Sequence, residues 1–249
     1  MGVDLGTAYL VLVVLDAMGE PVAGEYQFAS VARDGLVVDY FGAVDRLRGM
    51  KERVERRVGR RLTHAATGFP PGVPDGEVRA LRNVVEAAGF DCQQSIDEPS
   101  AANLVVKISD GAIVDVGGGT TGIAVVREGK VTYTADEPTG GTHFSLVIAG
   151  AKNVSFEEAE AMKKDPTLQP ALLPVVRPVM EKVASIVSRH ISGREVKQLT
   201  LVGGTCSFPG MGEVVEAYVG IPTFIPAEPM LITPLGIGLH DLHASKGGV

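Results

Sequence analysis

Two stretches of the chain share one pattern, "VDLGTAYLVLVVLD" at residues 3–16 and "IVDVGGGTTGIAVV" at residues 113–126. In each, an acid ends an apolar β-branched run, a glycine-containing turn follows, and a second apolar run begins. The two acids, Asp4 and Asp115, lie almost half the chain apart. A repeat at half-chain spacing predicts two similar lobes, each starting with a β-hairpin sheet.

The segments after each hairpin alternate between helix and strand patterns. In the first half, helical spacing over 47–62 precedes a strand at 64–70, a helix at 76–89 and a strand that runs into a helix over 94–104. In the second half, Ser155 and Glu158 form a capping box, followed by helix 174–191, strand 198–204 and helix 209–220. This order predicts the α/β class, and 249 residues suffice for one or two domains.

An acid at a strand end followed by bare glycines suits one particular chemistry. An ionised carboxylate there needs a partner such as Mg²⁺, and glycines let backbone N–H groups approach phosphoryl oxygens. The alternative for either loop alone is an ordinary hairpin turn, but two loops in matched contexts favour a phosphate clamp. The "GGGTTG" at 117–122 leads into a strand, which excludes a dinucleotide fingerprint, and the chain has no P-loop.

Composition narrows the classes of partner and compartment. The net charge of −7 and pI near 5.3 argue against nucleic acid as the main partner. Two cysteines, Cys92 and Cys206, make no disulfide framework and indicate a reducing cytosol. No apolar run is long enough for a membrane span, and the N-terminus does not resemble a signal peptide. We therefore expect a cytoplasmic protein.

With both loops in place, the chain resembles the actin-like ATPase superfamily, which includes heat-shock chaperones, sugar kinases and bacterial actins. "GVDLGT" and "VDVGGGTT" resemble its two phosphate motifs, "DEPSAANL" its first inter-lobe connection, "LTLVGGTCSFPGM" its adenosine motif and "EPMLITPLGIGL" its second connection. Within the superfamily, "VARDGLVVDYFGAV", "GRRLTHAATGFPPG", "GGGTTGIAVVREGKVTYTADEPTGG" and "SFEEAEAMKKD" are most similar to the chaperone-like ethanolamine-utilisation family, EutJ.

The resemblance implies a two-lobed fold with a central nucleotide cleft and reduced outer subdomains. The first lobe would comprise residues 1–107 with phosphate motif 1, and the second residues 108–249 with phosphate motif 2 and the adenosine motif. The bound cofactors would be ATP and Mg²⁺. Only Met1, Gly2 and Val3 precede Asp4, where the superfamily has more apolar residues, so we expect a shortened N-terminus.

The resemblance also implies a role for each motif residue. Asp4 and Asp115 would face each other across the cleft and hold Mg²⁺ through water, and Glu98 would orient the attacking water or act as general base. Phosphate contacts would come from Gly6, Thr7 and Ala8 in one lobe, and from Gly117, Gly118, Gly119 and Thr120 in the other. Ribose and adenine would be held by Glu160, Lys163 and Lys164, with Gly203, Gly204 and Thr205 under the adenosine.

Three activities stay open at this point. The first is an ATP-binding, weakly hydrolysing switch that acts on a client among ethanolamine-utilisation enzymes or microcompartment proteins. No motif supplies the γ-phosphate lysine of the heat-shock chaperones, so binding is better supported than turnover. The second is a small-molecule kinase, although the short chain leaves little length for a substrate pocket. The third is a polymerising scaffold. A module that has lost nucleotide binding is disfavoured, because Asp4, Glu98 and Asp115 are all present.

Three smaller features have both a structural and a functional interpretation. The predicted helix near residue 50 carries many basic residues. They could form a docking site for an acidic partner, but such a run is more often the solvent-exposed face of a helix. The residues are Arg46, Arg48, Lys51, Arg53, Arg56, Arg57, Arg60 and Arg61. Cys206 follows the adenosine glycines and is expected to pack in the core, and His143 is expected to make a hydrogen bond within its loop.

Overall fold

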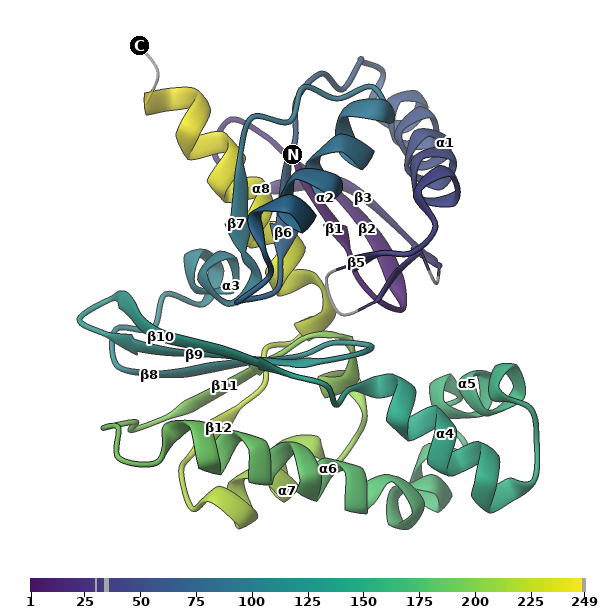
Figure 1. Cartoon of the computed structure of the whole chain (residues 1–249), viewed down its shortest axis with the longest axis vertical. Coiled ribbons are helices and arrows are strands. Elements are labelled where there is room, and N and C mark those ends of the chain that lie inside the picture. The colour runs from purple at the N-terminus through teal and green to yellow at the C-terminus, as the bar shows by residue number, and fades with distance from the viewer. Residues whose placement is uncertain (30, 34–35, 248–249) are drawn as a thin grey trace. The chain divides into compact units, whose positions relative to one another are not determined.

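The computed structural model describes residues 1–29, 31–33 and 36–247, so Asp34 and Gly35 of the segment 31–44 lie outside it. The chain forms two compact units, drawn in Figure 1. The first unit comprises Met1–Lys107 and Leu231–Val249, and the second comprises Ile108–Met230. The motif order predicts residues 231–249 in the second lobe, whereas the structure places them with the first unit.

The sheet of the first unit has five strands in the order β3-β2-β1-β6-β7. Strands β1 (Gly2–Leu5), β2 (Tyr9–Leu15) and β3 (Pro21–Phe28) form the predicted antiparallel hairpins, while β6 (Ala66–Phe69) and β7 (Ser95–Asp97) add in parallel. A separate two-stranded sheet pairs β4 (Ala32–Arg33) with β5 (Leu36–Val37). The central strand β1 is therefore paired on both sides.

Helices cover both faces of this first sheet. Because side chains alternate along a strand, Leu10, Leu12 and Val14 of β2 pack into a core with α1 (Tyr40–Val58) and α2 (Asp75–Ala87). On the opposite face, Ile237 of α8 (Pro229–Gly247) packs with Ala66 and with Ala101 of α3 (Glu98–Val106). The predicted helix over 47–62 is observed at 40–58, where Gly59 ends it in the left-handed conformation.

Close packing explains why α8 belongs to the first unit. A Cβ on Gly2 would overlap the Pro234 carbonyl, and a Cβ on Gly236 would overlap the Ala101 carbonyl, so backbones touch at both places. Such approach is available only to glycine. The positions lie more than 100 residues apart in sequence, which is why the sequence pattern did not reveal this contact.

The sheet of the second unit repeats the arrangement of the first, with the order β10-β9-β8-β11-β12. Strands β8 (Gly111–Val116), β9 (Thr121–Arg127) and β10 (Lys130–Glu137) are antiparallel, and β11 (Leu199–Val202) and β12 (Thr223–Phe224) add in parallel. Both sheets thus consist of three antiparallel strands followed by two parallel ones. The expected internal repeat is confirmed at the level of topology.

Helices pack on one face of the second sheet against alternate residues of β8, namely Ala112, Val114 and Val116. They are α4 (Gly141–Lys152), α5 (Phe156–Lys164), α6 (Gln169–Ile191) and α7 (Met211–Val219), with the 3₁₀ turn η1 (Gly204–Ser207) after β11. Figure 1 shows α6 and α7 together on this face. The predicted capping box is confirmed, since Ser155 accepts from the Glu158 N–H while the Glu158 carboxylate accepts from the Ser155 N–H.

No helix among the described residues is long and apolar enough to cross a membrane.

Candidate functional site

The two acids of the repeat occupy equivalent places in their own sheets. Asp4 is the penultimate residue of β1, the central strand of the first sheet, and Asp115 is the penultimate residue of β8, the central strand of the second. Each therefore lies at the carboxyl edge of the parallel part of a sheet, where α/β proteins usually bind ligands.

In the first unit, the loop after β1 turns tightly. A Cβ on Gly6 would lie 2.8 Å from the Tyr9 carbonyl oxygen, so this turn leaves little room for a side chain. Gly6, Thr7 and Ala8 are half-buried rather than covered. The Ala8 carbonyl accepts from the Ala29 N–H at 3.0 Å, which anchors the loop to the chain that leaves β3.

Glu98 lies at the same edge of the first sheet as Asp4. It follows β7 as the first residue of α3, whose N-terminus is capped by Asp97 accepting from the Ser100 N–H at 3.0 Å. The Glu98 Cγ atom would lie 3.4 Å from a Cβ on Gly68 of β6, the strand between β1 and β7. The Glu98 side chain therefore lies against the end of β6, while the glycine itself is needed to make room for Ile237 Cδ1, which would be 2.6 Å from that Cβ.

In the second unit, Asp115 lies against the start of the adenosine motif. The parallel register pairs Asp115 of β8 with Val202 of β11, so Gly203 follows directly beside the acid. A Cβ on Gly203 would overlap both Asp115 Oδ1 and the Val116 carbonyl oxygen, and Gly203 has φ +91°. The Asp115 side chain is therefore held close to backbone that only glycine can provide.

The phosphate-motif loop is tied to two other segments of the second unit. The Thr205 hydroxyl donates to the Gly117 carbonyl at 2.7 Å, and the Gly141 N–H donates to the same oxygen at 2.9 Å. The Thr142 N–H donates to the Gly118 carbonyl at 2.8 Å. These bonds join the loop after β8, the turn after β11 and the first turn of α4. The four loop residues Gly117, Gly118, Gly119 and Thr120 stay half-buried.

Glu160 and Lys163, both on α5, make a buried polar network beside that loop. Lys163 Nζ donates to Glu160 Oε2 at 2.5 Å and to the Gly141 carbonyl at 3.1 Å. Ser145 Oγ, fully buried on α4, donates to Glu160 Oε2 at 2.5 Å and accepts from Lys163 Nζ at 3.0 Å. Lys164 pairs with the other Glu160 oxygen at 3.1 Å and is more exposed.

Burial and charge act in opposite directions on this network. Burial works to raise the pKa of Glu160, but the Lys163 charge and the hydrogen bonds from Lys163, Ser145 and Lys164 outweigh it, so the pKa falls below its usual value. Burial lowers the pKa of Lys163, and the Glu160 charge opposes that shift. The 2.5 Å contact between them indicates an ion pair whose carboxylate is ionised at neutral pH.

Cys206 and His143 behave as the sequence suggested. Cys206 is buried, and its thiol lies 3.0 Å from the Val202 carbonyl. Burial, together with the nearby negative charge of Asp115, raises the pKa of Cys206 well above its usual value, so the thiol is not a nucleophile. His143 Nδ1 accepts from the Gly140 N–H at 3.2 Å, a hydrogen bond within the loop.

Within each unit, the structure gathers the predicted residues at one edge. Gly140, Gly141 and Ser145 complete the second unit's site and were not among the predicted binding residues. The available signal was "TGG" at 139–141 before an apolar helix. A Cβ on Gly140 would lie 2.6 Å from the Gly117 carbonyl oxygen, so this glycine is needed for close approach to the phosphate loop.

Among the residues that the structure describes, no three His, Cys, Asp or Glu side chains gather as a metal site. Mg²⁺ does not need such a cluster, because it keeps several waters and takes one or two carboxylates plus phosphate oxygens. The Asp115 carboxylate supplies hard oxygen donors beside a glycine loop. The backbone next to it carries no side chain that would compete for the ion. These residues fit a magnesium ion that arrives with a phosphate ligand.

Comparison with known proteins identifies the relatives of this chain. Residues 50–234 match the family model described as type IV pilus assembly protein PilM. The ethanolamine utilization protein EutJ of Escherichia coli strain K12 is 43% identical over 248 residues, which cover 99% of this chain and 87% of that protein.

Solved structures agree with these relatives. The crystal structure of EutJ from Carboxydothermus hydrogenoformans superposes with a TM-score of 0.92 and 49% identity, covering 96% of this chain and 88% of that one. MreB5 of Spiroplasma citri bound to AMPPNP superposes with a TM-score of 0.77 at 17% identity, covering 98% of this chain and 96% of that one. The fold is that of the actin-like ATPases.

Proposed function

The chain belongs to the family of the ethanolamine utilization protein EutJ, and on that premise we propose that it is a Mg²⁺–ATP-binding, chaperone-like protein of ethanolamine utilization. In this proposal it works in the bacterial cytoplasm as a nucleotide-driven switch on a client protein of that pathway or its microcompartment. The same fold in MreB5 bound to AMPPNP makes a nucleotide the natural ligand of the glycine loops.

One observation carries the proposal. In the second unit, Asp115 with the Gly117 loop, Thr205 and the Glu160–Lys163 pair come from three separate segments and are joined by hydrogen bonds or close backbone contact. An ordinary hairpin turn needs none of these links. A loop built only for geometry would not require glycine at both Gly140 and Gly203 to let other backbone reach it.

Each segment has a role in the proposal. Asp115 holds Mg²⁺ through water, and the loop Gly117, Gly118, Gly119 and Thr120 offers backbone N–H groups to the phosphates. Glu160, Lys163 and Lys164 recognise ribose and adenine, while Gly203, Gly204 and Thr205 let the adenosine lie against backbone. In the first unit, Asp4 and the loop of Gly6, Thr7 and Ala8 have the matching roles toward Mg²⁺ and phosphate, and Glu98 orients the attacking water.

We propose that turnover is slow and that binding is the main event. Phosphoryl transfer depends on positioning and on charge stabilisation of the transferred group. Asp4, Glu98 and Asp115 supply acidic groups, but no motif of this chain supplies the lysine that heat-shock chaperones use at the γ-phosphate. The protein then alternates between nucleotide-bound and nucleotide-free states, with client affinity differing between them.

Isothermal titration with Mg²⁺–ATP tests the proposal. Asp115→Ala is expected to abolish binding while circular dichroism shows a folded chain, and Glu181→Ala, an exposed acid on α6, serves as the control. Asp4→Ala measures the contribution of the first unit to binding. Equal affinity of wild type and Asp115→Ala contradicts the proposal.

A phosphate-release assay on the same samples separates the alternatives. Tight binding with slow release is expected for a switch. Release that becomes fast only when a sugar or an alcohol is added would instead indicate a kinase, and nucleotide-dependent sedimentation would indicate a polymerising scaffold.

A further inference from the structure

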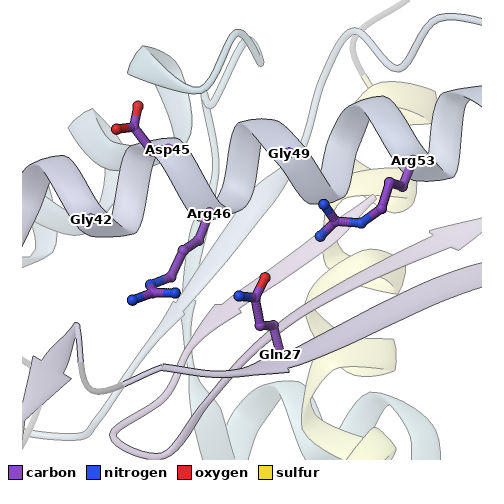
Figure 2. A pocket seen from close by; sticks show the side chains of 6 residues that line it. All are labelled: Gln27, Gly42, Asp45, Arg46, Gly49 and Arg53. Carbon is purple, nitrogen blue, oxygen red and sulfur yellow. The ribbon is translucent and has the colours of Figure 1, made fainter.

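A groove runs along α1 in the first unit, away from the strand ends that hold Asp4 and Glu98. Figure 2 shows it between one side of α1 and the edge strand β3. Its volume is about 360 Å³, which is within the range of small binding pockets. The residues that line it are Gln27, Gly42, Asp45, Arg46, Gly49 and Arg53.

The stripe of α1 that faces the groove alternates glycine with arginine. Gly42, Arg46, Gly49 and Arg53 are spaced three or four residues apart, so they share one helix face. Gly49 lies in the middle of the helix, where glycine is less favourable than alanine. A Cβ there would meet only the guanidinium of Arg53, at 3.2 Å. Nothing in the packing of the described residues requires this glycine, and its effect is to leave the groove floor open.

The groove is positively charged. Arg46 makes no ion pair or hydrogen bond in the part of the chain that the structure describes. Arg53 and Arg57 both bind Glu25 of β3 at 2.6 Å, so two cations share one carboxylate. Asp45 is turned to the other side of the helix in Figure 2 and pairs there with Arg48 at 3.1 Å.

We propose that this groove binds an acidic, extended segment of a partner protein. Guanidinium groups bind carboxylates in a planar two-point geometry, and Arg46 is available to do so. Arg46 and Arg53 are two helical turns apart, roughly 10 Å along α1, which a peptide in the extended polyproline II conformation spans in about three residues while side chains three positions apart stay on the same side. The segment should therefore carry two acids about three positions apart.

Nucleic acid is the less suitable occupant. The chain has a net charge of −7, and the Glu25 carboxylate lies beside Arg53 at the groove, so a continuous phosphate backbone would meet a carboxylate as well as arginines. Single carboxylates on a peptide can be placed opposite the arginines alone. The proposal does not depend on nucleotide binding, because none of its residues belongs to either glycine loop.

Fluorescence anisotropy without nucleotide tests the groove. The probe is a fluorescein-labelled serine-rich peptide with two glutamates three positions apart, and the same peptide with glutamines is its control. We expect the glutamate peptide to bind the wild type better, and the binding to weaken as salt is added. Arg46→Ala should weaken binding about fivefold, the effect of one largely exposed charge pair. Gly49→Leu should weaken it by about tenfold or more, because leucine fills the groove floor.

Matched variants separate the groove from general charge and folding effects. Arg79→Ala removes an exposed arginine from α2, and Gly150→Leu adds the same side chain to an open position on α4; both should bind as the wild type does. Gly49→Leu should also keep or raise the melting temperature, since leucine is the better helix former. The proposal fails if the wild type does not bind the glutamate peptide, if the groove and control variants bind it equally, or if a labelled oligonucleotide binds the groove more tightly.

Discussion

Asp115 and Gly203 lie so close in the second unit that a methyl group on Gly203 would overlap the Asp115 Oδ1 atom. The two residues are far apart in sequence and are brought together by the parallel pairing of β8 with β11. Gly203 also has φ +91°, a conformation that other residues adopt at a cost. The position of the proposed Mg²⁺ ligand therefore depends on a glycine in a different motif.

Gly203→Ala is expected to destabilise the fold and to displace Asp115. The positive φ costs about 1–2 kcal/mol, and the overlap adds to it, for a total of about 3 kcal/mol. Urea unfolding measures the loss. Gly220→Ala is the matched control, because Gly220 has φ +75° with no atom within 4 Å, and it should lose only about 1 kcal/mol. Equal losses in the two variants would show that Asp115 and Gly203 are not in close contact.

Glu160→Gln should destabilise the chain near neutral pH but not in acid. The pKa of Glu160 is lower in the folded chain than its ordinary value of 4.5, so the folded state binds the proton less tightly than the unfolded state does. Its contribution is fully present above pH 4.5 and is lost as pH falls through the lowered folded pKa. We expect a difference of about 2 kcal/mol from the wild type at neutral pH.

Urea unfolding of wild type and Glu160→Gln over a series of pH values checks this, with Glu181→Gln as the exposed control. A difference between wild type and Glu160→Gln that stays constant from neutral pH into strong acid would contradict an ionised Glu160.

Ser145→Ala should weaken the binding of ATP more than that of inorganic triphosphate. Ser145 bridges Glu160 and Lys163, the proposed ribose and adenine contacts, and does not belong to the phosphate loop. Loss of its hydrogen bonds should cost about 1–2 kcal/mol of folding stability. Competition titrations with both ligands measure the ratio, and Ser188→Ala on α6 is the control. A variant that binds both ligands equally less well would place Ser145 in general folding instead.

Both cysteines should resist alkylation in the folded chain. Burial raises the pKa of Cys92 to about 12 and that of Cys206 well above its usual value, so neither thiol ionises near neutral pH. Mass spectrometry after iodoacetamide treatment at mildly alkaline pH should find the native protein unmodified and the urea-unfolded protein doubly modified. Rapid modification of Cys206 in the native state would show that the turn after β11, which carries the adenosine motif, opens to solvent.

Much of the local structure could be predicted because its causes are local. The capping box of Ser155 and Glu158 spans three residues, and both appear in the sequence as a pattern. The two hairpins follow from β-branched runs separated by glycine turns. The resemblance of the motifs to the actin-like ATPases implied the two-lobed fold, which periodicity alone does not determine.

The limits of prediction have equally specific causes. The sequence motif marks residues 228–239 only as a connection between the lobes, whereas the backbone contacts of Gly2 and Gly236 and the packing of Ile237 attach α8 to the first unit. Ser145 is a small polar residue inside an apolar helix, a pattern that predicts no function. Its role emerges only when α5 brings Glu160 and Lys163 against α4.

The order of residue types along the chain is enough to predict that two acids each end a strand before a glycine turn, and that each acid belongs to one of two similar α/β halves. The contact of Asp115 with Gly203, and the hydrogen bonds from Thr205 and Gly141 to the Gly117 carbonyl, appear only once the chain is folded. Helix caps and hairpins form between residues that are close together in the sequence, so the sequence pattern reveals them. The contacts around Gly117 and Gly203 instead depend on strand register and on helix packing between segments that are far apart in the chain.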